Sequence, residues 1–302
     1  MPALARWLFW PVLLLASSGL WLALQADSPH QPGVPGASAG QPLVIAHRGG
    51  AGLWPENTLY AFEQASQLGV DMLEMDLHLS RDSQLVVIHD ATLERTTDGQ
   101  GEVAMYNLVQ LQRLDAGYQW SADGGLSHPY RNQGLRIPSF NEVLQRFPES
   151  LKAVEIKVPD AGMEARLCQA LKQHEQTERV IVSSFHNRSL ALFRQYCPQV
   201  ATSAGSGEVR LLLALNWLHL DRWLARPTYQ VLQIPHYHRG IQVSSPRLIR
   251  GAQRLGLQVQ LWTINETAAM RQLLEQGADG LITDYPDRAL HVLGRTGARP
   301  QP

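Results

Sequence analysis

The sequence predicts an α/β fold, a TIM (β/α)8 barrel over residues 43–295, from three observations. Short apolar runs alternate with amphipathic helical patterns, as repeated strand–helix units do. Two of these runs are too close together for a parallel crossover, which sets the number of barrel strands at eight. Histidine, arginine and carboxylate residues follow several runs, at the strand ends where barrels of this class place their active sites.

Nine short apolar or β-branched runs are candidate strands, and helical patterns with one apolar face separate most of them. The strands are expected at Leu43–Ala46, Met72–Leu77, Leu85–His89, Lys152–Val158, Val180–Ser184, Val200–Ala204, Val231–Pro235, Gln258–Thr263 and Gly280–Thr283. The helices are expected at Thr58–Leu68, Glu164–His174, Ser189–Tyr196, Pro246–Leu255, Thr267–Gln276 and Asp287–Leu293.

The second and third runs are predicted to form a β-hairpin. Only Ser80–Gln84 lies between them, and a parallel crossover needs roughly a dozen residues or more. The hairpin after strand 2 therefore adds one strand outside the ring. If the turn is Arg81–Gln84, with Ser80 opposite Leu85, the ladder places Asp76 opposite or nearly opposite His89.

Residues 92–137 do not follow the strand–helix pattern and contain several glycines. This composition predicts a small loop-rich insertion over the barrel mouth. Ser139 and Glu142 have the spacing of a capping box, so a helix is expected to begin there and to end near Phe147. Pro148 then stops the helix before the next barrel strand.

Residues 1–26 are expected to be an N-terminal transmembrane helix that anchors the barrel. Trp7–Leu24 is an uncharged apolar run that, at about 1.5 Å per residue, just crosses a ~30 Å hydrocarbon core. Because Arg6 precedes it, the positive-inside rule places the barrel of this single-pass protein on the non-cytoplasmic side, which is periplasmic in a bacterium. The alternatives are a signal peptide whose cleavage releases a secreted protein, and a bound amphipathic segment. Residues 27–42 are then a flexible linker and 296–302 a C-terminal tail.

Composition and charge exclude some classes of partner. The chain has 302 residues, of which 44% are hydrophobic and 18% charged, as in a folded globular protein. Its formal net charge of -1 offers no basic field, so no nucleic-acid partner is expected. The sequence leaves the oligomeric state open.

The two cysteines, Cys168 and Cys197, lie on predicted helices that follow consecutive strands. Neighbouring outer helices could bring them together, and an exported protein would meet oxidising conditions. Two cysteines alone do not define a disulfide, however, and buried free thiols are common in helices. A disulfide and a pair of free thiols both stay open.

Three acidic residues are candidate ligands of a metal ion. Glu74 and Asp76 stand two residues apart on one predicted strand, so both carboxylates emerge on the same face, and Glu155 lies on the next barrel strand. Converging carboxylates repel each other unless a cation lies between them. Oxygen ligands select Mg²⁺ or Ca²⁺ over zinc, so one divalent cation is expected. The competing interpretation is that these acids only pair with Lys157 and Arg48.

Seven motifs stand in order between Val44 and Leu293. They are Ala46–Gly50 with Pro55–Thr58, Glu74–Asp76, His89–Asp90, Val154–Lys157, Ser183–Phe185, Leu261–Asn265 and Gly280–Pro286. Together they resemble the glycerophosphodiester phosphodiesterase family, which belongs to the PLC-like phosphodiesterase superfamily of TIM barrels. A single His-Arg-Gly would be weak support, because short patterns recur by chance. The resemblance implies a metal-dependent phosphoric diester hydrolase.

The resemblance also implies roles for single residues. His47 and His89 are the acid and base of catalysis, and the sequence does not decide which is which. Arg48 contacts the phosphate, and Glu74, Asp76 and Glu155 hold the metal. The implied reaction transfers the phosphoryl group from the leaving alcohol to the neighbouring glycerol hydroxyl, which yields a cyclic phosphate that water can open.

Three further residues are expected near this site. Lys157, on the same face as Glu155, adds positive charge near the phosphate. Trp262 either lines the substrate pocket or packs in the core. Asn57 is expected to cap the first helix, with Thr58 beginning it, and is left out of the catalytic set.

The expected substrate is a glycerophosphodiester, hydrolysed to sn-glycerol 3-phosphate and an alcohol, or a lysophospholipid, hydrolysed to lysophosphatidic acid and an alcohol. Leu232–Pro235 and Trp262–Asn265 are similar to a single-span lysophospholipase D branch of the family. Leu211–Leu224 is unusually apolar for an outer helix, so it either packs on the barrel or forms an interfacial surface near the active site. A catalytically inactive lipid-binding module and a phosphodiesterase of another headgroup class are the alternatives.

Overall fold

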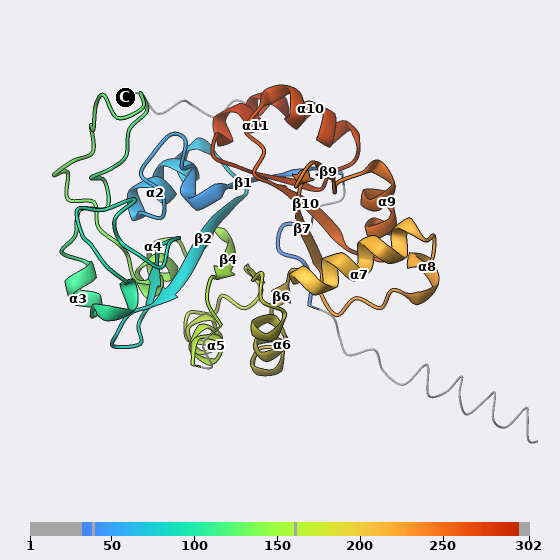
Figure 1. Cartoon of the computed structure of the whole chain (residues 1–302), viewed down its shortest axis with the longest axis horizontal. Helices are drawn as coiled ribbons and strands as arrows, with labels where there is room; N and C mark the ends of the chain where they lie inside the picture. Colours follow the sequence, from blue (N-terminus) through green and yellow to red (C-terminus); the bar gives the residue numbers. More distant parts are fainter. Residues whose placement is uncertain (1–31, 38–39, 160–161, 296–302) are drawn as a thin grey trace, which may run out of the picture. The chain divides into compact units, whose positions relative to one another are not determined.

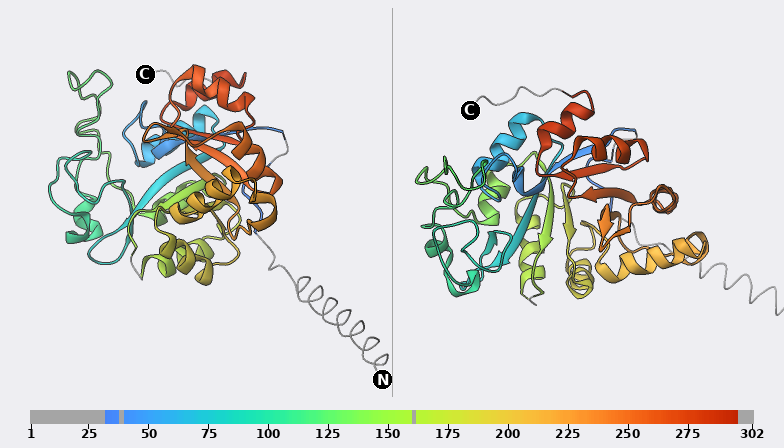
Figure 2. Two further views of the ribbon diagram at one scale, coloured as in Figure 1. Left: turned by 45° about the vertical axis from the view of Figure 1, so that its right-hand side comes forward. Right: turned by 45° about the horizontal axis from the view of Figure 1, so that its top comes forward.

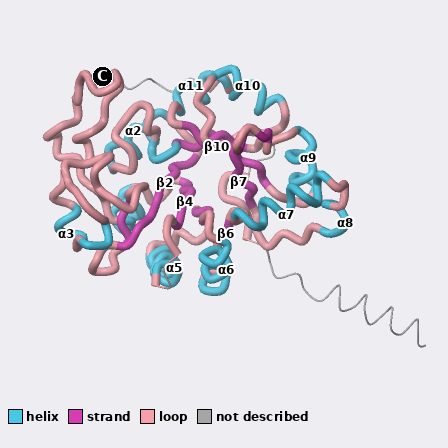
Figure 3. Tube along the Cα trace, viewed as in Figure 1, coloured by secondary structure: helices cyan, strands magenta, loops and turns pink. Residues whose placement is uncertain are grey.

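A ring of eight parallel strands forms the centre of the fold, and a ninth, antiparallel strand pairs with one of them. The computed structural model describes residues 32–37, 40–159 and 162–295. The ring has the order β6-β5-β4-β2-β1-β11-β10-β7, and a parallel bridge between Ser203 and Val231 joins its two ends (Figure 1). Helices lie around the outside of the strands (Figure 3). The predicted α/β barrel is therefore confirmed.

Outside residues 206–224, the predicted strands and helices agree with the observed ones to within a few residues. The ring strands are β1 (Leu43–Ala46), β2 (Met72–Leu79), β4 (Leu151–Ile156), β5 (Val180–Ser183), β6 (Ala201–Thr202), β7 (Val231–Pro235), β10 (Gln258–Trp262) and β11 (Gly280–Thr283). The outer helices are α2 (Leu59–Leu68), α4 (Phe140–Arg146), α5 (Met163–Gln173), α6 (Asn187–Tyr196), α7 (Ser206–Trp217), α8 (Asp221–Leu224), α9 (Pro246–Arg254), α10 (Thr267–Glu275) and α11 (Pro286–Val292).

Polar side chains explain where several helices begin. The hydroxyl of Thr58 accepts a backbone N–H in the first turn of α2. Ser139 and Glu142 form the predicted capping box of α4. Ser245 caps α9, whose first residue is Pro246. Each cap satisfies an N–H group that the helix itself leaves without a partner.

Inward-facing residues change from apolar to charged along the strands. On β2, Met72 belongs to an apolar cluster inside the ring, and the next inward positions hold Glu74 and Asp76. On the neighbouring β4, Ala153 belongs to the same cluster, and Glu155 follows it. Since successive residues of a strand point to opposite faces, the residues between them pack outward against the helices. The charged side chains thus lie at the carboxyl ends of the strands, and the apolar cluster lies deeper inside the barrel.

The predicted hairpin forms between β2 and β3 (Leu85–Val87), but its register differs by one residue from the expected one. Leu79 pairs with Leu85, and the backbone N–H of Ile88 donates to the carbonyl of Asp76. Asp76 therefore lies opposite Ile88, and His89 follows one position later. The reason is a three-residue turn in which Ser83 adopts a left-handed φ of 59°, a common way to close a hairpin.

The insertion after the hairpin has a small apolar core of its own. It contains the short helices η3 (Val103–Met105) and α3 (Leu108–Leu111), and Leu93 and Ile137 are among its buried residues. The indole N–H of Trp120 donates to the carbonyl of Ala51, 3.1 Å away. The insertion therefore lies against the loop that follows β1.

Leu211–Leu224 is not one helix, which corrects the expectation of a continuous apolar helix there. α7 ends at Trp217, and α8 begins at Asp221. Between them His219 adopts a left-handed φ of 64°, and the N–H of Leu220 returns to the carbonyl of Leu215. This pattern is a Schellman C-cap, which ends a helix.

Cys168 of α5 and Cys197, which follows α6, form a disulfide. The structure thus selects one of the two alternatives that the sequence leaves open. The predicted membrane helix within residues 1–26, by contrast, lies outside the described residues. Within the described ranges, no helix is long and apolar enough to cross a membrane.

Candidate active site

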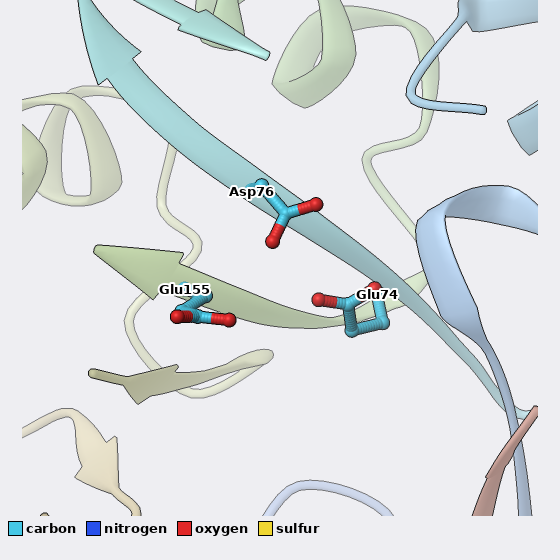
Figure 4. Close-up of side chains that lie close together, drawn as sticks. All are labelled: Glu74, Asp76 and Glu155. Carbon is cyan, nitrogen blue, oxygen red and sulfur yellow. The ribbon is translucent and has the colours of Figure 1, made fainter. Parts of the chain in front are cut away.

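Three carboxylates meet at the carboxyl end of the barrel. Glu74 and Asp76 extend from β2 and Glu155 from β4, and one oxygen atom of each lies within 4.8 Å of the others. Figure 4 shows the three side chains turned toward a common space between the two strands. The parallel pairing of Asp76 with Glu155 produces this arrangement, because it sets the two residues side by side with the same orientation.

Two cations compensate this negative charge only in part. The Nζ of Lys157 lies 3.4 Å from Asp76 and 3.2 Å from Glu155, and the Nε of Arg48 lies 3.5 Å from Asp76. Among the described residues, no lysine or arginine side chain pairs with Glu74, which accepts a 2.6 Å hydrogen bond from the backbone N–H of Arg48. Lys157 and Arg48 thus form ion pairs with Asp76 and Glu155, as expected. Glu74 forms no ion pair with either of them.

The pKa values of these acids reflect this imbalance. Burial and the neighbouring charge of Asp76 raise the pKa of Glu74 to about 8. Burial also raises the pKa of Glu155 above its ordinary value. Burial acts on Asp76 in the same direction, but Lys157 and Arg48 outweigh it, so the pKa of Asp76 is lowered. A cation between the three side chains would remove this repulsion, so their oxygen donors fit a hard divalent ion.

His47 lies at the end of β1, in the short helix η2 (His47–Gly49). Its Nδ1 lies 2.6 Å from a carboxylate oxygen of Asp284, the residue after β11. Asn265 donates a 2.7 Å hydrogen bond to the other oxygen of Asp284. Asp284 therefore fixes the orientation of the His47 ring, and Asn265 fixes the orientation of Asp284. The sequence motifs contained both Asp284 and Asn265, but nothing in their spacing indicated this contact.

Glycine is required where η2 turns toward the site. Gly49 has a φ of 82°, and a Cβ atom there would lie 2.9 Å from the side chains of Ala61 and Phe62 in α2. Both the backbone conformation and the close approach of the helix exclude a larger residue. This turn fixes the position of the neighbouring Arg48, which has a left-handed φ of 52°.

His89 follows β3, and its Nδ1 lies 2.5 Å from Asp90. Asp90 also forms an ion pair with Arg95. Arg95 in turn forms a bidentate ion pair with Glu56, at 2.7 and 2.8 Å. Glu56 in turn accepts a 2.9 Å hydrogen bond from Arg48. A continuous network of charged side chains therefore connects the second histidine to the predicted phosphate contact. Sequence reasoning missed Glu56 and Arg95, because their partners are up to 39 residues away.

The two histidines have pKa values shifted in opposite directions. Burial lowers the pKa of His89, and the opposing effects of Asp76 and Asp90 do not offset it. Burial also acts to lower the pKa of His47, but the charge of Glu74 and the hydrogen bond to Asp284 outweigh it, so this pKa is raised. Opposite shifts of this kind are typical of an acid–base pair.

Asn57 is buried at the site, which corrects its expected role as a helix cap. Thr58 caps α2 instead. The amide of Asn57 donates a 2.9 Å hydrogen bond to Asp76, and its own φ of 57° is left-handed. Asn57 therefore fixes the orientation of one of the three acids. The signal for this role was its place in the Pro-Glu-Asn-Thr motif.

Trp262, at the end of β10, has aromatic and apolar neighbours. Its ring meets that of Phe185 edge to face, with centroids 5.7 Å apart. It also packs against the apolar cluster inside the barrel. The geometry thus brings together His47, His89, the three acids, Arg48 and Lys157, and places Trp262 among aromatic and apolar neighbours. Its predicted contact with substrate stays a prediction.

Comparisons with known proteins agree with this geometry. The model of the glycerophosphoryl diester phosphodiesterase family matches residues 47–288. A glycerophosphodiester phosphodiesterase of Caldanaerobacter subterraneus subsp. tengcongensis is 32% identical over 262 residues, which cover 84% of this chain and 99% of that protein. A lysophospholipase D of Mus musculus is 28% identical over 278 residues, which cover 84% and 87%. The structure of an Oleispira antarctica phosphodiesterase in complex with the product sn-glycerol-3-phosphate is similar with a TM-score of 0.68 and 29% identity, over 84% of this chain and 97% of that one.

Proposed function

Because the chain belongs to the glycerophosphoryl diester phosphodiesterase family and is a phosphoric diester hydrolase, we propose that it hydrolyses glycerophosphodiesters to sn-glycerol 3-phosphate and an alcohol at this barrel mouth. One observation carries the proposal. Two histidines, each hydrogen-bonded to a carboxylate, adjoin the same three-acid cluster. The product named for the Oleispira antarctica enzyme supports the assignment of the glycerol phosphate portion.

In the proposed mechanism, His89 is the general base and His47 the general acid. His89, with the lowered pKa, takes the proton of the glycerol hydroxyl next to the phosphodiester, and that oxygen forms the new bond to phosphorus. His47, with the raised pKa, gives its proton to the alcohol oxygen as the bond between that oxygen and phosphorus breaks. The cyclic phosphate is then opened by water with the two roles exchanged.

The remaining residues bind the phosphodiester and hold the two histidines. Arg48 can direct its planar donors at phosphate oxygens, and Lys157 adds a positive charge beside them. Glu74, Asp76 and Glu155 would hold one divalent cation, Mg²⁺ or Ca²⁺, which supplies charge neutralisation at the phosphate when bound. Asp284 and Asp90 fix the orientation of His47 and His89.

The test is an assay of the purified protein with glycerophosphocholine, in which choline and glycerol 3-phosphate are measured separately. We expect turnover with Mg²⁺ or Ca²⁺ and its loss in excess chelator. His47→Ala and His89→Ala should each lower turnover by at least ~10² while the fold is retained. An inactive native protein with both metals supplied would favour the lipid-binding module, and turnover of only another headgroup class would favour the other alternative.

A lysophospholipid is the second candidate substrate. The relative from Mus musculus is named a lysophospholipase D, and Phe185 and Tyr237 expose more than half of their surface at the carboxyl ends of β5 and β7. Apolar side chains there could contact an acyl chain. The comparison of lysophosphatidylcholine with glycerophosphocholine tests this candidate. Faster turnover of glycerophosphocholine would exclude lysophospholipids as the main substrate.

The proposed location is the non-cytoplasmic side of a membrane, with residues 1–26 as the anchor. The apolar run Trp7–Leu24 supports this location. The disulfide between Cys168 and Cys197 supports it as well, because disulfides persist in oxidising compartments. Protease added to intact cells, or to bacterial spheroplasts, should cleave the protein. Full protection, with cleavage only after lysis, would contradict the location.

A further inference from the structure

The segment that contains α7 and α8 exposes a group of large apolar side chains. Trp217 exposes 81% of its surface, Trp223 66% and Leu211 61%. We call this group the α7–α8 patch; its members are Leu211, Trp217, Leu218, Leu220, Trp223 and Leu224. Single exposed apolar residues are ordinary, but six within fourteen residues indicate a surface that binds a partner or a membrane in the functioning protein.

The local fold keeps these side chains exposed. On α7, Leu212 and Asn216 are buried, and the amide of Asn216 donates a 2.7 Å hydrogen bond to Asp221 at the start of α8. This bond and the left-handed turn at His219 set α8 against the end of α7. The two helices lie outside the ring of strands in all three ribbon views (Figures 1 and 2).

The exposed charged residues of the segment, from 210 to 226, are all arginines. Arg210, Arg222 and Arg226 are exposed, and Arg222 lies over the ring of Trp223, 5.5 Å from its centre. Asp221, the only acidic residue from 210 to 226, is buried and hydrogen-bonded to Asn216. The exposed surface therefore combines tryptophan and leucine side chains with arginines that have no carboxylate partner in the part of the chain that the structure describes.

The segment adjoins the side of the barrel on which the mouth opens. An Nη of Arg247, in the first turn of α9, lies 2.5 Å from Nε2 of His219. α9 begins shortly after the hairpin of β8 (Tyr237–His238) and β9 (Ile241–Gln242), which follows the carboxyl end of β7. Ile241 in this hairpin is 71% exposed. The turn between α7 and α8 thus lies beside the end of α9 that follows the carboxyl end of β7.

We propose that the α7–α8 patch lies in the interfacial zone of a bilayer that contains anionic lipids. Tryptophan and leucine enter the boundary between headgroups and acyl chains, and arginine pairs with anionic headgroups. A second copy of the chain is a poorer occupant, because a two-fold interface would set the three arginines of one patch against those of the other. An anionic surface complements the charge that is present.

The position of the sequence's apolar run supports the same occupant. Seven residues separate Leu24 from Pro32, where the described structure begins. At about 3.5 Å per residue these seven residues reach at most about 25 Å. If Trp7–Leu24 lies in a bilayer, the barrel is held close enough for its surface to contact the headgroups.

The test places an environment-sensitive fluorophore on the patch in the full-length chain. Trp217→Cys accepts the label, because both native cysteines are in the disulfide. Leu126→Cys is the matched control, since Leu126 is an apolar side chain that is 89% exposed in the insertion. Unchanged turnover of glycerophosphocholine shows that each labelled variant is folded. The chains are reconstituted into vesicles of phosphatidylcholine with and without phosphatidylglycerol.

We expect a blue shift and quenching by spin-labelled lipid at position 217, with phosphatidylglycerol present, and neither change at position 126. Adding Arg222→Glu and Arg226→Glu to the labelled Trp217→Cys chain should abolish the effect. A label at 217 that stays water-exposed in both vesicles would overturn the proposal. Equal shielding without phosphatidylglycerol would refute the anionic partner, and shielding that rises with protein concentration in lipid-free detergent would indicate a second copy instead.

Discussion

The Nδ1 atom of His47 lies 2.6 Å from the Oδ1 atom of Asp284, although 237 residues separate the two in the chain. The ring closure produces this contact. β1 and β11 are neighbouring parallel strands, and Ala46 pairs with Thr283. The residue after each of these therefore leaves the barrel at the same point. The first histidine of the site thus depends on the last strand of the fold.

Asp284→Asn should lower kcat by about 10² with little change in KM. The asparagine can still accept a hydrogen bond, but its neutral side chain no longer stabilises the protonated imidazole. Steady-state kinetics with glycerophosphocholine measures the change. Glu275→Gln, an exposed position on α10, is the control and should behave as the native protein. Native turnover by Asp284→Asn would contradict the proposed role.

The pH profile of kcat/KM should have an acidic limb from His89 and an alkaline limb from His47. The pKa of His89 is lowered, so this base becomes neutral, and activity rises, at a pH below the ordinary value for histidine. The pKa of His47 is raised, so this acid stays protonated, and activity falls, only above that value. His89→Ala should remove the acidic limb from its residual activity and His47→Ala the alkaline one. Loss of the alkaline limb in His89→Ala and of the acidic limb in His47→Ala would make His89 the acid and His47 the base.

Glu74→Gln should weaken binding of Mg²⁺ or Ca²⁺, measured by calorimetry on metal-free protein. The substitution removes a buried carboxylate that has no lysine or arginine partner among the described residues, and one ligand of three is lost. Glu142→Gln, in the capping box of α4, is the control away from the cluster. Equal metal affinity in native protein and Glu74→Gln would show that the three acids do not form the metal site.

Arg95→Ala should lower kcat/KM by about 10-fold to 100-fold without unfolding the protein. Arg95 holds both Asp90 and Glu56, and these carboxylates position His89 and Arg48. A small misplacement of reacting groups has effects of this size. The matched control is Arg136→Ala, which removes an exposed arginine of the same insertion from its ion pair with Glu142. Equal losses in the two variants would show that the effect is not specific to the network.

Replacement of Cys168 and Cys197 by serine should lower the free energy of unfolding by about 3 kcal/mol. The disulfide closes a loop between residues 29 apart, and its loss gives the unfolded chain more freedom. Urea unfolding with and without reductant measures the difference. Reductant should destabilise the native protein and leave the double variant unchanged. A native protein that is indifferent to reductant would contradict a structural disulfide.

Local patterns in the sequence determined the barrel and most residues of its candidate site. The alternation of apolar runs and amphipathic helices identified the repeated units, because burial of one helix face and of whole strands imposes those periods. The spacing of Glu74 and Asp76 placed both acids on one face of a strand, since side chains alternate along a strand. The short interval at Ser80–Gln84 indicated the hairpin that brings His89 back to this site.

The tertiary structure decided the contacts that depend on closure of the ring and on loop conformation. Asp284 meets His47 because the last strand pairs with the first, and Arg95 meets Glu56 because the insertion folds back on the mouth. The hairpin register differs by one residue from the expected one because Ser83 takes a left-handed conformation. Asn57 is available to donate a hydrogen bond to Asp76 because Thr58, and not Asn57, caps α2. Such contacts depend on the backbone geometry of turns and strand pairs. The spacing of apolar residues in the sequence does not reveal this geometry. A sequence pattern therefore named the candidate reacting groups, whereas only the folded chain determined which side chains hold them.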